Sequence, residues 1–387
     1  MLSDVIRERG PMTVAAFMDL ALYDPSFGYY ARSTRRSGAA GDFFTSVDVG
    51  AVFGELLESQ VAEMAALLSA DANEPVDLVE AGAGSGRLSA DILRAARVRH
   101  RGAYDRFRLH LVEASPAARD EQRATLGDVS ERLVSSSTQL PERINGIVFA
   151  NELLDAMPTH QVVMRDEGLR EMYVSPALAL HEGPPSTPAL AEYLLRLGVT
   201  LEPGWRVEIN LRAIEWIRDL ARRLDRGFVI LIDYGHEARE LYSVGHSNGT
   251  LTTFARHTAE GPESSAGTPR WLKSPGEQDI TAHVDFTSVR AAAEEEGLFT
   301  LGFLDQTYFL LALSQNLENL GNLENPENPE NPENPENPEN LENLKKRLAL
   351  KTLIMPGGLG STMKVLIFGK GVGRPPLRGC SFAVRAT

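Results

Sequence analysis

Residues 76–93 read VDLVEAGAGSGRLSADIL, a short apolar run followed by a glycine-rich turn and a helical pattern. Glycines in such a turn let a ligand approach the backbone N–H groups at the beginning of the helix. A dinucleotide site needs a small residue at the third required position of Gly-x-Gly-x-x-Gly/Ala. Arg87 occupies that position, so the short spacing of Gly82, Gly84 and Gly86 favours a nucleotide-like ligand other than NAD.

Two glutamates narrow the choice of ligand. Glu80 directly precedes the glycine turn, where a carboxylate suits the ammonium group of a methionine moiety better than a pyrophosphate. Glu113 ends the next apolar run, where a carboxylate can accept both ribose hydroxyls. Either residue alone is also consistent with an ordinary strand-end carboxylate in solvent. The pair predicts S-adenosylmethionine as the cofactor, with the binding residues Glu80, Gly82, Gly84, Gly86, Glu113 and Asn151.

Apolar runs and helical patterns alternate on both sides of this turn. The runs lie at 76–82, 107–115, 131–137, 146–152 and 227–235. This alternation predicts an α/β, Rossmann-like core, a parallel sheet with helices on both faces. Two late runs, at 298–306 and 363–371, are expected to add edge strands.

Changes of pattern divide the chain into five parts. We expect an N-terminal helical or lid region at 1–70 and a core at 71–315 that carries a hairpin-like insertion at 160–205. An Asn-Pro-Glu repeat fills 316–344, and its regular prolines predict a disordered or extended segment. A tolerated loop expansion is favoured over an interaction tether there. A strand within 345–373 would complete the core before a tail at 374–387.

Composition excludes several classes of protein. The chain has 387 residues, a formal net charge of -14 and one cysteine, Cys380. The negative charge disfavours nucleic-acid binding, and a single cysteine excludes an internal disulfide framework. No signal peptide, transit peptide or membrane span is recognisable, so we expect a soluble, cytoplasmic protein.

Acidic residues follow the fourth and fifth predicted strands. Asn151 and Glu152 end the run at 146–152, Asp155 follows it, and Asp233 lies near the end of the run at 227–235. Ligands of open α/β sheets bind beyond the carboxyl ends of the strands. A carboxylate there can orient a protonated nitrogen and accept its proton. We predict catalytic roles for these acids, although a helix cap for Asp155 and a strand-end turn for Asp233 remain open alternatives.

Two other motifs have less specific interpretations. Asp42, in GDFFTS (41–46), is a fourth candidate catalytic acid, and the adjacent Phe43 and Phe44 either cover a small ligand or anchor the loop. His283 and Asp285 alternate in a strand-like register without further ligands at the spacing of a metal site. The sequence therefore predicts no metal.

The order of these motifs resembles that of the MidA family, which includes a mitochondrial complex I assembly factor. The resemblance covers nearly the whole chain apart from the repeat and the tail. It rests on GPMTVAAFMDLALYDPSFGYY, GDFFTS, FGE, EAGAGSGRLSADIL, NELLDAMP, IDYG, PGEQDITAHVDF and MKVLIFGKG. It implies a class I methyltransferase fold, with a mostly parallel seven-stranded sheet, an N-terminal helical region and a hairpin insertion.

The resemblance also implies a function. It implies S-adenosylmethionine at Gly82, Gly84 and Gly86 with Glu113, and a protein acceptor such as the arginine of a complex I subunit that the mitochondrial relative dimethylates. We therefore predict a methyltransferase that acts on a protein side-chain nitrogen. The alternative is an assembly factor that keeps this fold with little or no turnover. An NAD-dependent oxidoreductase is disfavoured by Arg87, and the oligomeric state is left open.

Overall fold

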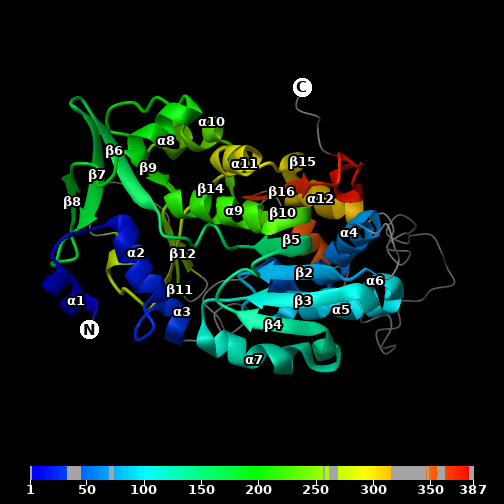
Figure 1. The fold of residues 1–387 in the computed structure, drawn as a ribbon. Coiled ribbons are helices and arrows are strands. Elements are labelled where there is room, and N and C mark those ends of the chain that lie inside the picture. The colour runs from blue at the N-terminus through cyan, green and yellow to red at the C-terminus, as the bar shows by residue number, and fades with distance from the viewer. Residues whose placement is uncertain are drawn as a thin grey trace, which may run out of the picture.

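The computed structural model describes residues 2–32, 45–68, 74–255, 258–260, 269–314, 346, 348–354 and 362–382. Its central sheet has seven strands in the order β15-β16-β10-β5-β2-β3-β4, and the short β14 adds to β10 (Figure 1). The strands are β2 (Val76–Ala81), β3 (Phe107–Val112), β4 (Leu133–Ser137), β5 (Ile144–Asn151), β10 (Leu224–His236), β14 (Val284–Asp285), β15 (Phe299–Asp305) and β16 (Met363–Lys370). The predicted α/β fold is confirmed.

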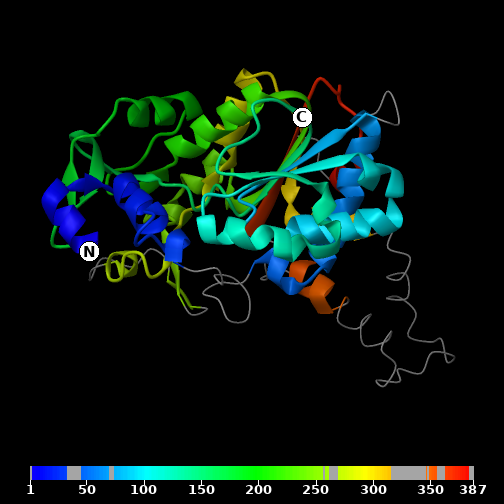
Figure 2. The same cartoon turned by 60° about the horizontal axis from the view of Figure 1, so that its bottom comes forward.

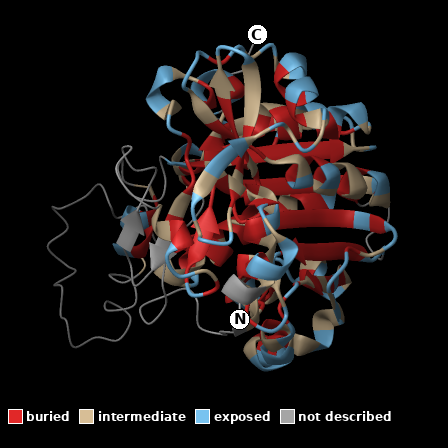
Figure 3. Cartoon of the chain, turned by 90° about the vertical axis from the view of Figure 1, so that its left-hand side faces the viewer, coloured by how far each residue is buried: buried red, intermediate tan, exposed pale blue. Residues whose placement is uncertain are grey.

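Helices cover both faces of this sheet. Successive side chains of a strand point to opposite faces, so Leu78 of β2 packs on one side while Val79 packs on the other. The first side is covered by α4 (Val52–Leu68), α5 (Arg87–Arg99) and α12 (Gln306–Ser314). The second is covered by α9 (Leu211–Arg223) and α11 (Phe286–Glu295). The inner strands β2, β5, β10 and β16 are consequently buried along most of their length (Figure 3), as expected where helices cover both faces.

One predicted edge strand lies inside the sheet instead. The five strands from β4 to β10 are parallel, whereas β16 pairs antiparallel with β10 and with β15. Of the two late runs, only the one that forms β15 lies at an edge of the sheet. The prediction for 363–371 was therefore wrong in position, because an apolar run at the end of a chain does not reveal which two strands it separates.

A second, antiparallel sheet stands beside the first (Figures 1 and 2). The predicted hairpin is present as β6 (His160–Arg165) and β7 (Gly168–Val174), and β1 (Met12–Thr13), β8 (Leu180–Gly183) and β9 (Arg206–Ile209) extend it. The N-terminal helices α1 (Leu2–Arg9) and α2 (Val14–Tyr23) contribute Ile6 and Phe17 to a core shared with Val163 and Val174 of the hairpin. The N-terminal region is thus packed on the insertion.

The remaining elements connect these layers. They are α3 (Tyr29–Arg32), η1 (Ser46–Val49), α6 (Arg101–Arg106), α7 (Pro116–Leu126), η2 (Gly127–Arg132), α8 (Ala189–Leu197), α10 (Ala238–Leu241), η3 (Val244–His246), β11 (Thr252–Ala255), β12 (Thr258–Glu260), η4 (Arg270–Leu272), β13 (Asp279–Thr281) and η6 (Arg378–Cys380). The N–H groups of Arg378 and Gly379 donate to Glu63 and Gln60 of α4. Part of the predicted tail therefore packs on the core, whereas Asp42 and the repeat lie outside the described residues.

Candidate cofactor and acceptor site

The glycine turn lies between β2 and α5 and has three left-handed residues. Gly82, Gly84 and Gly86 have φ values of 73°, 50° and 82°, a region that residues with a Cβ adopt at a cost. A Cβ at Gly82 or Gly86 would lie 3.1 Å from a leucine methyl group, but one at Gly84 would meet nothing within 4 Å. Open space therefore adjoins Gly84, as the approach of a ligand requires.

Glu113 fixes the middle of this turn. Its two carboxylate oxygens accept the N–H groups of Gly84 (2.8 Å) and Ser115 (2.7 Å). Each oxygen retains a second lone pair that a hydroxyl group can use. Gln122 of α7 donates its amide to the carbonyl of Gly84 at 2.8 Å. Gln122 lies in no motif, so its support of the turn was not visible in the sequence.

Glu80 is anchored at the beginning of α5. One carboxylate oxygen accepts both the N–H (3.2 Å) and the hydroxyl of Ser89, a helix-capping arrangement. Burial raises the pKa of Glu80 to about 8. The structure therefore shows a supporting role for Glu80, and its predicted contact with an ammonium group remains a prediction.

The 3-10 helix η1 links the glycine turn to the acidic residues after β5. Arg87 pairs with Asp48 of η1 at 3.1 Å, and the N–H of Ser46 donates to Glu152 Oε1 at 3.4 Å. Thr45 and Asp48 form a capping box that begins η1. The bulky residue that excludes a dinucleotide fingerprint thus holds η1 beside the turn.

Glu152 occupies an unusual backbone conformation at the end of β5. Its φ is 52°, a left-handed value that is uncommon outside glycine and often marks functional sites. The Asn151 amide donates to Glu152 Oε1 at 3.0 Å, which leaves Asn151 Oδ1 buried without a hydrogen bond. Burial, together with the neighbouring charge of Asp233, raises the pKa of Glu152 to about 8.

Asp233 organises the turn that carries these acids. Its Oδ2 accepts the N–H groups of Leu153 (3.1 Å) and Leu154 (2.7 Å), and its Oδ1 accepts that of Tyr234 (2.9 Å). Burial raises the pKa of Asp233 to about 7, against the lowering effect of these hydrogen bonds. Both oxygens are thus engaged by backbone groups, and the predicted catalytic role of Asp233 remains a prediction.

Asp155 is the most isolated acid of the group. It is 6% exposed, and its Oδ1 has no hydrogen-bond partner. Burial raises the pKa of Asp155 well above its ordinary range, and Asp233, Glu152 and Asp279 raise it further. In the described part of the chain, no lysine or arginine forms an ion pair with Glu152, Asp155 or Asp233.

The N-terminal region brings two phenols to this group. Tyr23 donates its hydroxyl to the carbonyl of Ala156 at 2.9 Å, and Tyr30 donates to Asp279 Oδ1 at 2.9 Å. The two rings lie 5.2 Å apart. Both tyrosines and Asp279 belong to motifs that the sequence singles out, but their spacing along the chain does not show that they meet at the acids after β5.

The family follows from a comparison with known proteins. The model of Methyltransf_28, a family of S-adenosyl-L-methionine-dependent methyltransferases, matches residues 56–304. The chain belongs to this family. The predicted family, enzyme class and cofactor are therefore confirmed, and the open space at Gly84 fits such a cofactor.

Curated relatives and a solved structure extend this result. A mitochondrial protein arginine methyltransferase of Danio rerio, NDUFAF7, is 29% identical over 341 residues, which cover 80% of this chain and 74% of that protein. Its Xenopus laevis counterpart is 30% identical and covers 79% of this chain and 71% of that protein. A crystal structure from Burkholderia thailandensis bound to S-adenosyl-homocysteine has a TM-score of 0.83 and 28% identity, covering 100% of this chain and 95% of that one.

Proposed function

We propose that this methyltransferase modifies a guanidinium nitrogen of arginine in a protein. The supporting observation is the group formed by Glu152, Asp155 and Asp233, three closely placed acids that no cation of the described residues neutralises. Buried charges are normally paired. A guanidinium ion has the charge, the planar shape and the five N–H donors that such a set of acceptors can bind.

We assign the cofactor to the carboxyl ends of the parallel strands, beside the glycine turn. Its proposed contacts are Glu80, Gly82, Gly84, Gly86, Glu113 and Asn151. When bound, S-adenosylmethionine supplies a methyl group on a sulfonium, which a nucleophilic nitrogen can displace. The chain contributes the open approach at Gly84 and the free lone pairs of Glu113, which suit ribose hydroxyls.

Glu152 and Asp155 are the proposed catalytic residues. Their carboxylates would accept N–H bonds from the guanidinium and turn one nitrogen toward the glycine turn. The raised pKa values of both groups favour acceptance of the proton that this nitrogen loses. Asp233 would act through its hold on Leu153 and Leu154. Asp42 remains a fourth candidate, on residues that the structure does not describe.

The relatives support a protein acceptor, since they are named protein arginine methyltransferases. A subunit of a respiratory complex I is the first acceptor to examine, and we expect the reaction in the cytoplasm rather than in a mitochondrion. No helix among the described residues has the length and apolarity to cross a bilayer.

Methyl transfer in extract from a deletion strain tests this proposal. The purified protein and S-adenosylmethionine carrying a tritiated methyl group should label one or a few proteins, and mass spectrometry should place the label on arginine. The Glu152→Gln variant should give no label while still binding S-adenosyl-homocysteine in calorimetry. Label on lysine or glutamine would contradict an arginine acceptor. Absence of label with wild-type protein would favour an assembly role.

A further inference from the structure

Three histidines from separate segments meet near the end of β10. His236 is the last residue of β10, His246 ends η3, and His283 lies between β13 and β14. The ring centroids lie 4.8 Å (His236 and His246), 5.1 Å (His236 and His283) and 6.0 Å (His246 and His283) apart. One ring nitrogen from each residue can be chosen so that all three lie within 4.8 Å of one another. All three residues are partly buried.

The backbone holds these rings in place. Strands β10 and β14 pair in parallel, which fixes His236 beside the residues that follow His283. The N–H of His283 donates to Thr250 Oγ1 at 3.0 Å. His246 Nδ1 lies 3.0 Å from the carbonyl oxygen of Glu240, so it donates there and its Nε2 carries the free lone pair. A hydrogen bond of this kind on the opposite nitrogen is typical of metal-ligating histidines.

The other two rings keep buried nitrogens without hydrogen bonds. His283 Nδ1 and His236 Nδ1 both lack a hydrogen-bond partner. Glu240 Oε1 lies 3.1 Å from His236 Nδ1, but its orientation does not make a hydrogen bond. Buried polar atoms are usually satisfied. A bound metal ion would supply the missing partner of these nitrogens.

The surrounding charges also suit a cation. Glu240 is the carboxylate beside the rings. Lys364 also acts on His236, but its ammonium group is paired with Asp305. Asp285, which the sequence offered as a partner of His283, instead accepts the N–H groups of Thr287 (2.9 Å) and Ser288 (3.2 Å) at the beginning of α11. The grouping could not be predicted from spacing, since the other two histidines come from distant segments.

We propose that His236, His246 and His283 bind a divalent transition-metal ion of the zinc class, with Glu240 adding negative charge beside it. Three imidazoles are a common zinc ligand set that leaves one position for water or a carboxylate. Zinc–nitrogen bonds of about 2.0–2.1 Å in a tetrahedral site place the ligand atoms roughly 3.4 Å apart. Ligand atoms that now lie within 4.8 Å of one another therefore have to approach by up to about 1.4 Å when the metal binds.

Cobalt titration of the full-length protein tests the site directly. Metal-free protein should bind about one equivalent of Co²⁺ and develop the visible absorption of tetrahedral cobalt, and Zn²⁺ should displace it. Zn²⁺ should also raise the melting temperature in a concentration-dependent way. A wild-type protein that shows neither the absorption nor the shift would overturn the proposal and leave the rings as a packing cluster.

Variants separate this site from unspecific metal binding. His246→Ala, in the 3-10 helix η3, should weaken Zn²⁺ binding at least 100-fold. His283→Gln should have the same effect while keeping most of the side-chain volume. Glu240→Gln should weaken it about 10-fold, as for other residues around a metal. His181→Ala, on β8, is the matched control and should bind as wild type does. Equal affinity of the His181 and His246 variants, with both folded by circular dichroism, would refute the assignment.

Discussion

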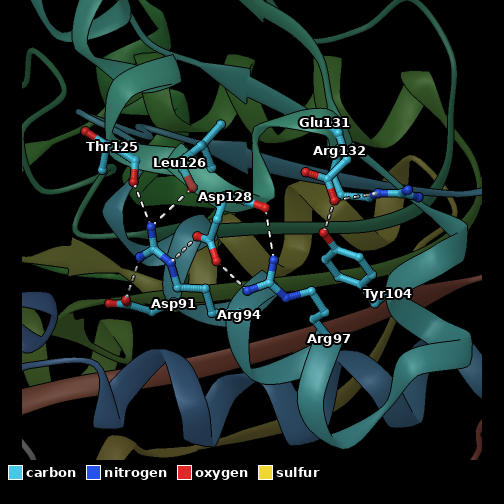
Figure 4. A network of polar contacts seen from close by, with 9 residues as sticks. All are labelled: Asp91, Arg94, Arg97, Tyr104, Thr125, Leu126, Asp128, Glu131 and Arg132. Carbon is cyan, nitrogen blue, oxygen red and sulfur yellow. Dashed lines mark hydrogen bonds and ion pairs between the residues drawn. The ribbon is translucent and has the colours of Figure 1, made fainter.

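Two acidic regions of this protein have opposite surroundings. Asp128 lies on the surface beside α5, where Arg94 Nε donates to it at 3.1 Å and Arg97 also pairs with it (Figure 4). These arginines lower the pKa of Asp128. Glu152 and Asp155, beyond the end of β5, have no such partners among the described residues, and burial raises their pKa values.

The comparison shows that acidic residues that stabilise the fold and acidic residues proposed to act in catalysis lie in different parts of the protein. The surface network also ties helices together, since Arg94 donates to the carbonyls of Thr125 (3.0 Å) and Leu126 (3.2 Å) at the end of α7. Asp155, after β5, instead keeps an acceptor oxygen without a hydrogen bond. A chain that maintains buried acids without cations sacrifices stability there, which is explicable if a substrate supplies the cation.

The largest expected effect is on methyl transfer. Asp155→Asn and Glu152→Gln should each lower kcat by about 10²–10⁴-fold, because each removes a carboxylate that can accept a proton. Single-turnover kinetics with the acceptor from the labelling experiment would measure this. Binding of S-adenosyl-homocysteine should change only slightly. A variant with wild-type kcat would remove that acid from the catalytic machinery.

The pH dependence of the free energy of unfolding should show how much the burial of Glu152 destabilises the protein. Burial raises the pKa of Glu152 to about 8, so the native state prefers the protonated form. The resulting stability is complete below the unfolded pKa, near 4.5, and is lost as the pH rises through 8. Glu152→Gln does not titrate. It should therefore match wild type at pH 5 and exceed its free energy of unfolding by roughly 1–3 kcal/mol at pH 9.

Denaturant melts at several pH values test this directly. Asp128→Asn is the control, since the pKa of Asp128 is lowered rather than raised. If the difference in the free energy of unfolding between Glu152→Gln and wild type does not change between pH 5 and pH 9, the raised pKa of Glu152 is contradicted.

Asp233→Asn should have an intermediate effect. Asparagine cannot present two accepting oxygens to the backbone groups of Leu153, Leu154 and Tyr234. We expect a loss of about 1–3 kcal/mol in the free energy of unfolding and a raised KM for the acceptor. Comparison of KM and kcat would show whether the residue positions or reacts. A drop in kcat alone, with unchanged stability, would favour a direct catalytic role.

The smallest effect is expected at the surface. Asp128→Asn should shift the melting temperature by about 2 °C or less, because exposed ion pairs contribute little and are screened by salt. Methyl transfer should be unchanged. Melting curves at low and high salt would check this, and a large loss that persists in high salt would show that the arginine network has a more important role than its exposure suggests.

Much of the fold and part of the site could be predicted from the sequence. The strands that end just before Gly82, Glu113 and Glu152, and the strand that contains Asp233, follow from apolar runs whose lengths and separators are diagnostic. The roles of the acidic residues are harder to predict from the sequence. The same strand-end pattern fits a carboxylate with an unpartnered oxygen and a carboxylate that accepts backbone hydrogen bonds. Asp155 keeps an unpartnered oxygen, whereas Asp233 is engaged by backbone groups.

Contacts between distant segments could not be predicted. Tyr30 meets Asp279 across most of the chain, and Gln122 supports the glycine turn from a helix of ordinary composition. Without aligned homologues, only three-dimensional packing reveals such pairs. The position of β16 between β10 and β15 likewise could not be predicted from the sequence.

That position of β16 has a consequence for synthesis of the protein. The strand that joins β15 to the rest of the sheet is made after the Asn-Pro-Glu repeat, near the end of the chain. A ribosome that has translated as far as residue 314 has made β15 but not the strand that it pairs with. Premature termination within the repeat would therefore leave β15 without the strand that joins it to β10.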